Sequence, residues 1–123
     1  RLYQVFQHTA TMLQNALLFV KALLEDRWTD DLVVIYELVE VVRTANLEMM
    51  SNDKAHQFTR RCFVACQRYA AYPCEERRLQ VFSTWAKLSV REKHQLRKVV
   101  RCTQATKRNK MLLELAGAKV PTE

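Results

Sequence analysis

The chain has 123 residues, of which 49% are hydrophobic and 27% are charged, and its formal net charge is +7. This apolar content excludes a disordered or low-complexity chain, and the length fits one domain with a single core. The one glycine, Gly117, is too few for a phosphate-binding loop, a dinucleotide fingerprint, a nucleophile elbow or the turns of an all-β fold. We therefore expect an all-α protein that is not an enzyme and binds no cofactor.

Apolar residues recur at helical spacing in the first half of the chain. The first predicted helix runs from Leu2 to about Glu25, and the second from about Asp30 to Met50. The second segment is rich in valine and isoleucine, which is also typical of a strand. We favour a helix because Glu37, Glu40 and Arg43 recur every three residues on one face. Apolar side chains cover most of its circumference, which predicts a place at the centre of a bundle.

Capping and breaking residues delimit two further helices. Residues 51–53 (Ser-Asn-Asp) form a capping cluster that opens a third helix, predicted from Asp53 to Tyr72. Pro73 ends this helix because proline lacks the backbone N–H that a helix interior needs. The fourth helix is predicted to run from Cys74 to Leu88.

A capping box opens the fifth predicted helix. Ser89 and Glu92 have the spacing at which the serine side chain bonds forward and the glutamate bonds back. We predict one helix from about Val90 to Ala116, then a left-handed Gly117 and a tail over residues 117–123. Residues 1–116 should thus form a single helical domain, a compact bundle of about five helices with connections of two to four residues.

Basic residues gather on two predicted helix faces. Residues 1–53 carry a net charge of −4 and residues 54–123 a net charge of +11, and Glu92 is the one acidic residue between positions 77 and 113. Basic side chains at helical spacing can neutralise successive phosphates, although a solvated helix face explains the same pattern. The residues that we predict to contact nucleic acid are Arg60, Arg61, Arg68, Lys93, Arg97, Lys98, Arg101 and Arg108.

The type of nucleic acid is left open by the sequence. The fourth and fifth helices can form a helix-turn-helix that places the fifth helix in a DNA groove, although the turn lacks the usual glycine. RNA is an equal candidate. Tyr3, Trp28, Tyr72 and Trp85 lie near predicted helix ends, and we expect them to pack in the core, so no base-stacking residue is assigned.

The end of the fifth predicted helix carries apolar residues on the side that is basic upstream. A straight helix cannot bury both sides against one core, so either it kinks near Asn109 or the apolar residues meet another chain. A third alternative is that they cover the open end of the bundle. The candidate partner or dimer contacts are Met111, Leu112 and Leu115.

Three cysteines and a histidine are spaced as His56, Cys62, Cys66 and Cys74, and residues of these types ligate zinc. No Cys-x2-Cys pair is present, and the first two of these cysteines share a predicted core stripe with Phe58 and other apolar residues. We therefore expect no bound metal. Free thiols in a reducing compartment are favoured over disulfides through Cys74 or Cys102.

The leading interpretation is a non-catalytic helical module whose basic C-terminal half binds RNA or DNA, with self-association indicated by the charge asymmetry and the terminal leucines. The alternative is an assembly domain whose basic face meets an acidic protein surface. A secreted helical signalling protein ranks third. Docking to an anionic membrane surface ranks last, because no apolar segment flanks the basic stripe of the fifth predicted helix, which is formed by Lys93, Arg97, Lys98, Arg101 and Arg108. We expect a fragment or processed product, because the chain begins at arginine, and an intracellular location.

Overall fold

The computed structural model describes residues 10, 12–14, 16–17, 20, 30–45, 47, 50 and 52–118. These residues contain helices and no strand, which confirms the all-α prediction. Residues 10, 12–14, 16–17 and 20 are helical, and the rest of the helix predicted at Leu2–Glu25 lies outside the described residues. The longer helices are α2 (Asp30–Thr44), α3 (Gln57–Ala71), α4 (Glu75–Ala86), α5 (Val90–Arg101) and α6 (Ala105–Leu115).

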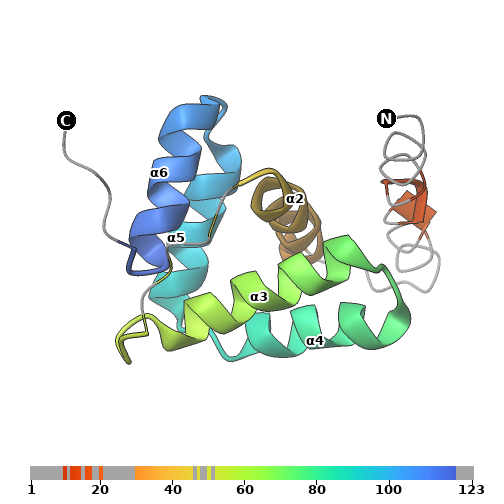
Figure 1. The fold of residues 1–123 in the computed structure, drawn as a ribbon, viewed down its shortest axis with the longest axis horizontal. Helices are drawn as coiled ribbons and strands as arrows, with labels where there is room; N and C mark the ends of the chain where they lie inside the picture. The colour runs from red at the N-terminus through yellow and green to blue at the C-terminus, as the bar shows by residue number, and fades with distance from the viewer. Residues whose placement is uncertain are drawn as a thin grey trace.

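Helix α2 lies at the centre of the arrangement, as predicted. Figure 1 shows α3 and α4 side by side across the lower part of the molecule and α5 and α6 upright beside them. Helix α2 contacts α3, α4 and α5. Its valine and isoleucine side chains are buried on several sides, which explains why this β-branched run is stable as a helix.

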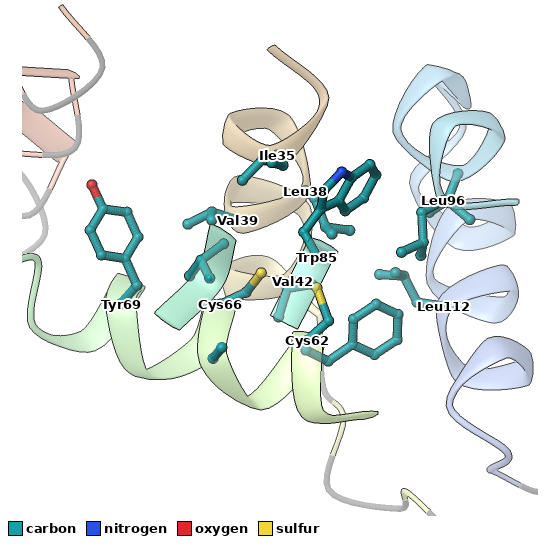
Figure 2. Close-up of a cluster of buried hydrophobic side chains, with 14 of the residues drawn as sticks. Ile35, Leu38, Val39, Val42, Cys62, Cys66, Tyr69, Trp85, Leu96 and Leu112 are labelled. Carbon is teal, nitrogen blue, oxygen red and sulfur yellow. The ribbon is translucent and has the colours of Figure 1, made fainter. Parts of the chain in front are cut away.

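The hydrophobic core joins the two helix pairs through α2. Leu38 and Val42 of α2 face Trp85 of α4, and Leu96 of α5 and Leu112 of α6 approach them from the other side (Figure 2). Each of these five side chains is at most 3% exposed. Burying a large apolar side chain contributes about 1.5–3 kcal/mol, so these side chains hold α2, α4, α5 and α6 together, and Phe63 of α3 (0% exposed) joins the same cluster.

The structure confirms the capping residues predicted at two helix ends, the start of α5 and the end of α6. Ser89 Oγ accepts a hydrogen bond from the Glu92 backbone N–H (3.1 Å), and the Glu92 carboxylate accepts one from the Ser89 backbone N–H (2.9 Å). The second carboxylate oxygen of Glu92 accepts a hydrogen bond from the buried Thr59 hydroxyl of α3 (2.9 Å). Gly117 has φ = 76°, and the Gly117 and Ala118 N–H groups donate to the carbonyls of Glu114 and Leu113. This pattern is a Schellman motif, which ends α6.

The connection between α2 and α3 is longer than predicted. Helix α2 ends at Thr44 rather than Met50, and Leu47 then enters the core at 2% exposure. Helix α3 begins at Gln57 rather than Asp53. Asp53 Oδ1 accepts a hydrogen bond from the His56 backbone N–H (3.1 Å), so the capping cluster closes a turn before the helix instead of opening it.

The single fifth helix predicted over Val90–Ala116 is wrong. The chain breaks at residues 102–104, where Cys102 is extended (φ −74°, ψ 117°), and not near Asn109. The break reverses the chain direction, so that α6 packs beside α5. Leu96 and Leu112, which would lie on different sides of one straight helix, both enter the same core.

The domain limits predicted from the sequence stay a prediction. Gly117 and Ala118, assigned to the tail, belong to the end of α6, and Ala118 is buried. Residues 119–123 lie outside the described part of the chain. In the described part, no helix is both long enough and apolar enough to cross a membrane.

Candidate functional site

An open depression of 860 Å³ lies over the exposed side of α3 and is bordered by α4 and by the connection that follows α2. Three of the predicted nucleic-acid contacts, Arg60, Arg61 and Arg68, line it together. No acidic side chain occurs among the described residues that line it. The polar side chains beside the arginines are Asn52, Gln57, Gln67, Gln80, Ser83 and Thr84. The depression therefore combines positive charge with neutral hydrogen-bond donors.

The three arginines differ in how freely they present their charge. Arg60 is 13% exposed, and its guanidinium donates to the Asp53 carboxylate (3.0 Å) and to the Asp53 backbone carbonyl. Its charge is therefore compensated inside the protein. Arg61 and Arg68 are exposed and form no ion pair with any described residue. These two side chains carry the positive potential of the depression.

Aromatic side chains lie at both ends of α3, on the exposed side. Phe58, predicted in the core, is 38% exposed, and the Arg61 guanidinium carbon lies 5.6 Å from its ring centroid. Tyr72, also predicted in the core, is 65% exposed. Arg77 of α4 lies 5.4 Å from the Tyr72 ring centroid and donates a hydrogen bond to the Arg68 carbonyl (2.6 Å). Each end of the exposed α3 face thus carries an aromatic ring against a guanidinium.

Phe58 is predicted in the core because it shares the helical stripe of Cys62 and Cys66, and Tyr72 because core packing is the ordinary role of an aromatic residue near a helix end. The prediction holds for Trp85, which is 3% exposed. Phe58 is in the first turn of α3, and Tyr72 comes after its last helical residue. Helical periodicity gives no reliable direction for side chains at such ends, so no sequence signal separates these two residues from Trp85.

The predicted basic stripe of α5 is divided among several roles. Arg97 donates a hydrogen bond to the Asp31 carboxylate of α2 (2.5 Å), and its guanidinium lies 6.0 Å from the Trp85 ring centroid. Lys98 and Arg101 are exposed, and Lys93 is half-buried. The predicted contact of Arg97 with nucleic acid therefore competes with a contact that the folded protein already makes.

Arg108 does not continue the stripe. It belongs to α6, beyond the break at residues 102–104, and its guanidinium donates to the Cys102 carbonyl (3.3 Å). The structure thus brings together the three arginines of α3 and keeps Lys93, Arg97, Lys98 and Arg101 on α5, but it separates Arg108 from the other residues predicted on the same helix face.

The Arg97–Asp31 contact changes the acidity of the carboxylate. Partial burial raises the pKa of Asp31, but the hydrogen bond from Arg97 and the nearby positive charges outweigh it, so the pKa lies below its usual value. The Trp85 indole N–H, which has no hydrogen bond of normal geometry to a described residue, also favours the ionised carboxylate. Asp31 is therefore ionised at neutral pH and holds Arg97 in place.

The predicted partner contacts at the end of the chain lie against the chain's own core. Leu112 is 0% exposed and belongs to the core cluster. Met111 and Leu115 are partly buried against the same cluster. Leu112 is therefore unavailable to a second chain in this fold, and the apolar end of α6 closes the bundle instead.

The histidine and cysteines considered as zinc ligands do not converge. Cys62 and Cys66 are fully buried together in the core (Figure 2), whereas His56 Nδ1 lies 3.1 Å from Asp53 Oδ1. The hydrogen bond with Cys62, together with burial, raises the pKa of the Cys66 thiol. No group of three or more metal-ligating side chains occurs among the described residues, and the cysteines are free thiols.

Comparison with known proteins found no relative of this chain. No protein-family model, no curated protein and no solved structure matches the chain. The interpretation of the site therefore rests on its own geometry and chemistry.

Proposed function

We propose that the chain is a non-catalytic nucleic-acid-binding module and that the depression over α3 and α4 is its interface. The observation that carries the proposal is the pair of exposed arginines, Arg61 and Arg68, which form no ion pair with a described residue and lie in a depression with no acidic side chain among its described lining residues. Phosphate groups are the natural complement of such a surface, because arginine donates two parallel hydrogen bonds to a phosphate.

The neutral side chains of the depression support the same proposal. Gln67 of α3, and Gln80 and Ser83 of α4, can donate to phosphate or sugar oxygens without adding charge. Much of the positioning contact in protein–nucleic acid interfaces is of this kind. Lys98 and Arg101 of α5 are exposed and would add a general attraction to a long polyanion.

The direct test is a salt titration. Fluorescence anisotropy would follow labelled single-stranded RNA, single-stranded DNA and duplex DNA as protein is added at three salt concentrations. Contact with two or three phosphates on a single strand gives a log–log slope of about −1.4 to −2.1. Absence of binding to all three probes at low salt would overturn the proposal and favour an acidic protein partner.

We predict that the double substitution Arg61→Glu and Arg68→Glu weakens binding at least about tenfold, because it replaces two phosphate contacts by repulsive charges. The matched control is Lys107→Glu with Lys110→Glu, which makes the same change of net charge at exposed positions of α6. We expect the control to lose less than about threefold. Equal losses in the two variants would show that only the overall charge matters and would contradict the assignment of the site. Circular dichroism would verify that both variants are folded.

A further inference from the structure

We propose that the α3 interface takes a single strand with unpaired bases, and that Phe58 and Tyr72 are the platforms on which bases stack. This inference rests on the proposed function and specifies its ligand class. Proteins that bind single strands combine a positively charged groove with exposed aromatic side chains, because every base presents a flat π-face once it leaves a duplex. The exposed side of α3 has both components.

The Tyr72 ring is held in place by α4. Arg77 packs against the ring at 5.4 Å from its centroid, and the same guanidinium donates a hydrogen bond to the Arg68 carbonyl at the end of α3. The ring nevertheless remains 65% exposed. A side chain that is ordered before binding loses little conformational entropy when a base stacks on it, so this geometry favours stacking.

Phe58 provides the corresponding surface at the other end of α3. Its ring is 38% exposed and lies against the Arg61 guanidinium, which is within the range of a cation–π contact. A guanidinium beside an aromatic ring offers a flat surface on which a base can rest, and a charge that can reach the adjoining phosphate. Phe58 and Arg61 therefore combine the two kinds of contact in one place.

The spacing of the two rings fits a short strand. Positions 58 and 72 are fourteen residue steps apart, all but the last within α3, which corresponds to about 21 Å between their Cα atoms at 1.5 Å per residue. A stacked strand advances about 3.4 Å per nucleotide, so this Cα separation corresponds to about six nucleotides. Single-strand binding sites commonly cover about 4–16 nucleotides. Along the chain, Arg61 and Arg68 lie between the two aromatic residues; the arginines line the depression, and the rings lie beside its lining at the two ends of α3, so the arginines can meet the phosphates of the intervening nucleotides.

A duplex does not use these features. Its bases are stacked on one another, so the faces that Phe58 and Tyr72 would contact are covered. Reading a duplex needs a helix or strand that enters a groove, and one of the α5 residues predicted to contact nucleic acid, Arg97, is paired with Asp31. A duplex would therefore meet the basic surface through phosphates alone.

The experiment compares three probes of equal strand length by fluorescence anisotropy: a single-stranded 12-mer, the same sequence as a duplex, and an abasic 12-mer that keeps the sugar-phosphate backbone. We expect the wild-type protein to bind the single strand at least about tenfold more tightly than the abasic strand, since each stacked base contributes about 5- to 150-fold. Equal affinity for the single strand and the abasic strand would overturn the stacking inference.

Ring-removing variants test the two side chains directly. Phe58→Ala with Tyr72→Ala should reduce single-strand affinity at least about tenfold and leave the salt slope and abasic affinity unchanged, because no charge is lost. Phe58→Trp with Tyr72→Trp should retain binding. Val90→Ala, at an apolar position that is 84% exposed on α5, is the matched control and should bind like the wild type.

The outcomes separate this inference from the proposed function. If the alanine variant binds every probe like the wild type while the Arg61→Glu and Arg68→Glu variant does not, the interface stands and stacking is overturned. If the wild type binds none of the probes at low salt, the proposed function itself is overturned. Circular dichroism and thermal unfolding of each variant would show that the losses do not come from unfolding.

Discussion

At the residue scale, Arg97 shows how one side chain connects separate helices. It lies on α5, its ion-pair partner Asp31 is in the first turn of α2, and Trp85 beneath it is near the end of α4. Both members of the pair are about one-third exposed, so the ion pair alone is worth about 0.2–1 kcal/mol. The contact with the indole ring adds about 0.5–1 kcal/mol.

We predict that Arg97→Gln lowers the free energy of unfolding by about 1–2 kcal/mol, because it removes both contacts. Urea denaturation would measure the change, and Lys98→Gln at the exposed neighbouring position should cost less than about 0.5 kcal/mol. The pKa of Asp31 is lowered in the folded state, so this contribution is present above the unfolded pKa near 3.8 and is lost as the pH falls through the folded value. A pH-independent difference between the variant and the wild type would contradict this account.

At the scale of the element, the end of α6 depends on one backbone conformation. Gly117 has a positive φ of 76°, and its N–H and that of Ala118 satisfy two carbonyls of the last turn. The turn directs Ala118 into the protein, where it is 9% exposed. Only glycine takes this conformation without a steric cost from a Cβ atom.

We predict that Gly117→Ala destabilises the protein by about 1–2 kcal/mol, since a left-handed conformation costs an L-residue about that much. Gly117→Asn should be milder, because asparagine tolerates the left-handed region. Chemical denaturation of the two variants would measure this order. A Gly117→Ala variant as stable as the wild type would show that the Schellman motif does not contribute to stability.

At the scale of the whole molecule, the core makes the two helix pairs depend on each other. Leu112 reaches from α6 toward Leu38 and Val42 of α2, which also packs against α3 (Figure 2). Removing a fully buried leucine costs about 2–5 kcal/mol, and burying a charge in its place adds to that cost. A small helical protein has a total stability of only about 5–15 kcal/mol.

We therefore predict that Leu112→Asp unfolds the protein or lowers its melting temperature by more than about 10 °C, rather than changing its oligomeric state. Leu79→Asp, at an exposed apolar position of α4, is the control and should leave the melting temperature nearly unchanged. Thermal unfolding by circular dichroism and the mass from light scattering would be measured together. A folded Leu112→Asp variant of lower mass would contradict the core assignment and restore the leucine as a partner contact.

Short sequence motifs correctly predicted those features of the fold that depend only on residues close together in the sequence. Ser89 with Glu92, and Gly117, act within one helical turn, and the structure confirms both. The start of α2 at Asp30 was predicted, whereas its end and the break at residues 102–104 were not. Residues 102–104 include neither glycine nor proline, so no helix-breaking residue marks the break. The break follows from the need to bury Leu96 and Leu112 in one core, and the sequence showed this conflict without showing where the chain would resolve it.

The candidate site was predictable only in part for a similar reason. Helical spacing placed Arg61 and Arg68 on one face of α3, and both line the depression. The neighbours supplied by α4, such as Gln80, depend on how the two helices pack. The Tyr72 ring packs against Arg77, which lies on the next helix, so its surroundings could not be deduced from helical periodicity.

The carboxylate of Glu92 has a consequence for how the molecule opens. One of its oxygens closes the first turn of α5, and the other accepts the hydroxyl proton of Thr59, which lies on α3 and is 4% exposed. If this turn frayed, the buried Thr59 hydroxyl would lose its hydrogen-bond acceptor, and α5 would lose its N-terminal cap. The beginning of α5 should resist the local opening that is usual for helix ends, and its amide protons should exchange with solvent only when α3 and α5 separate.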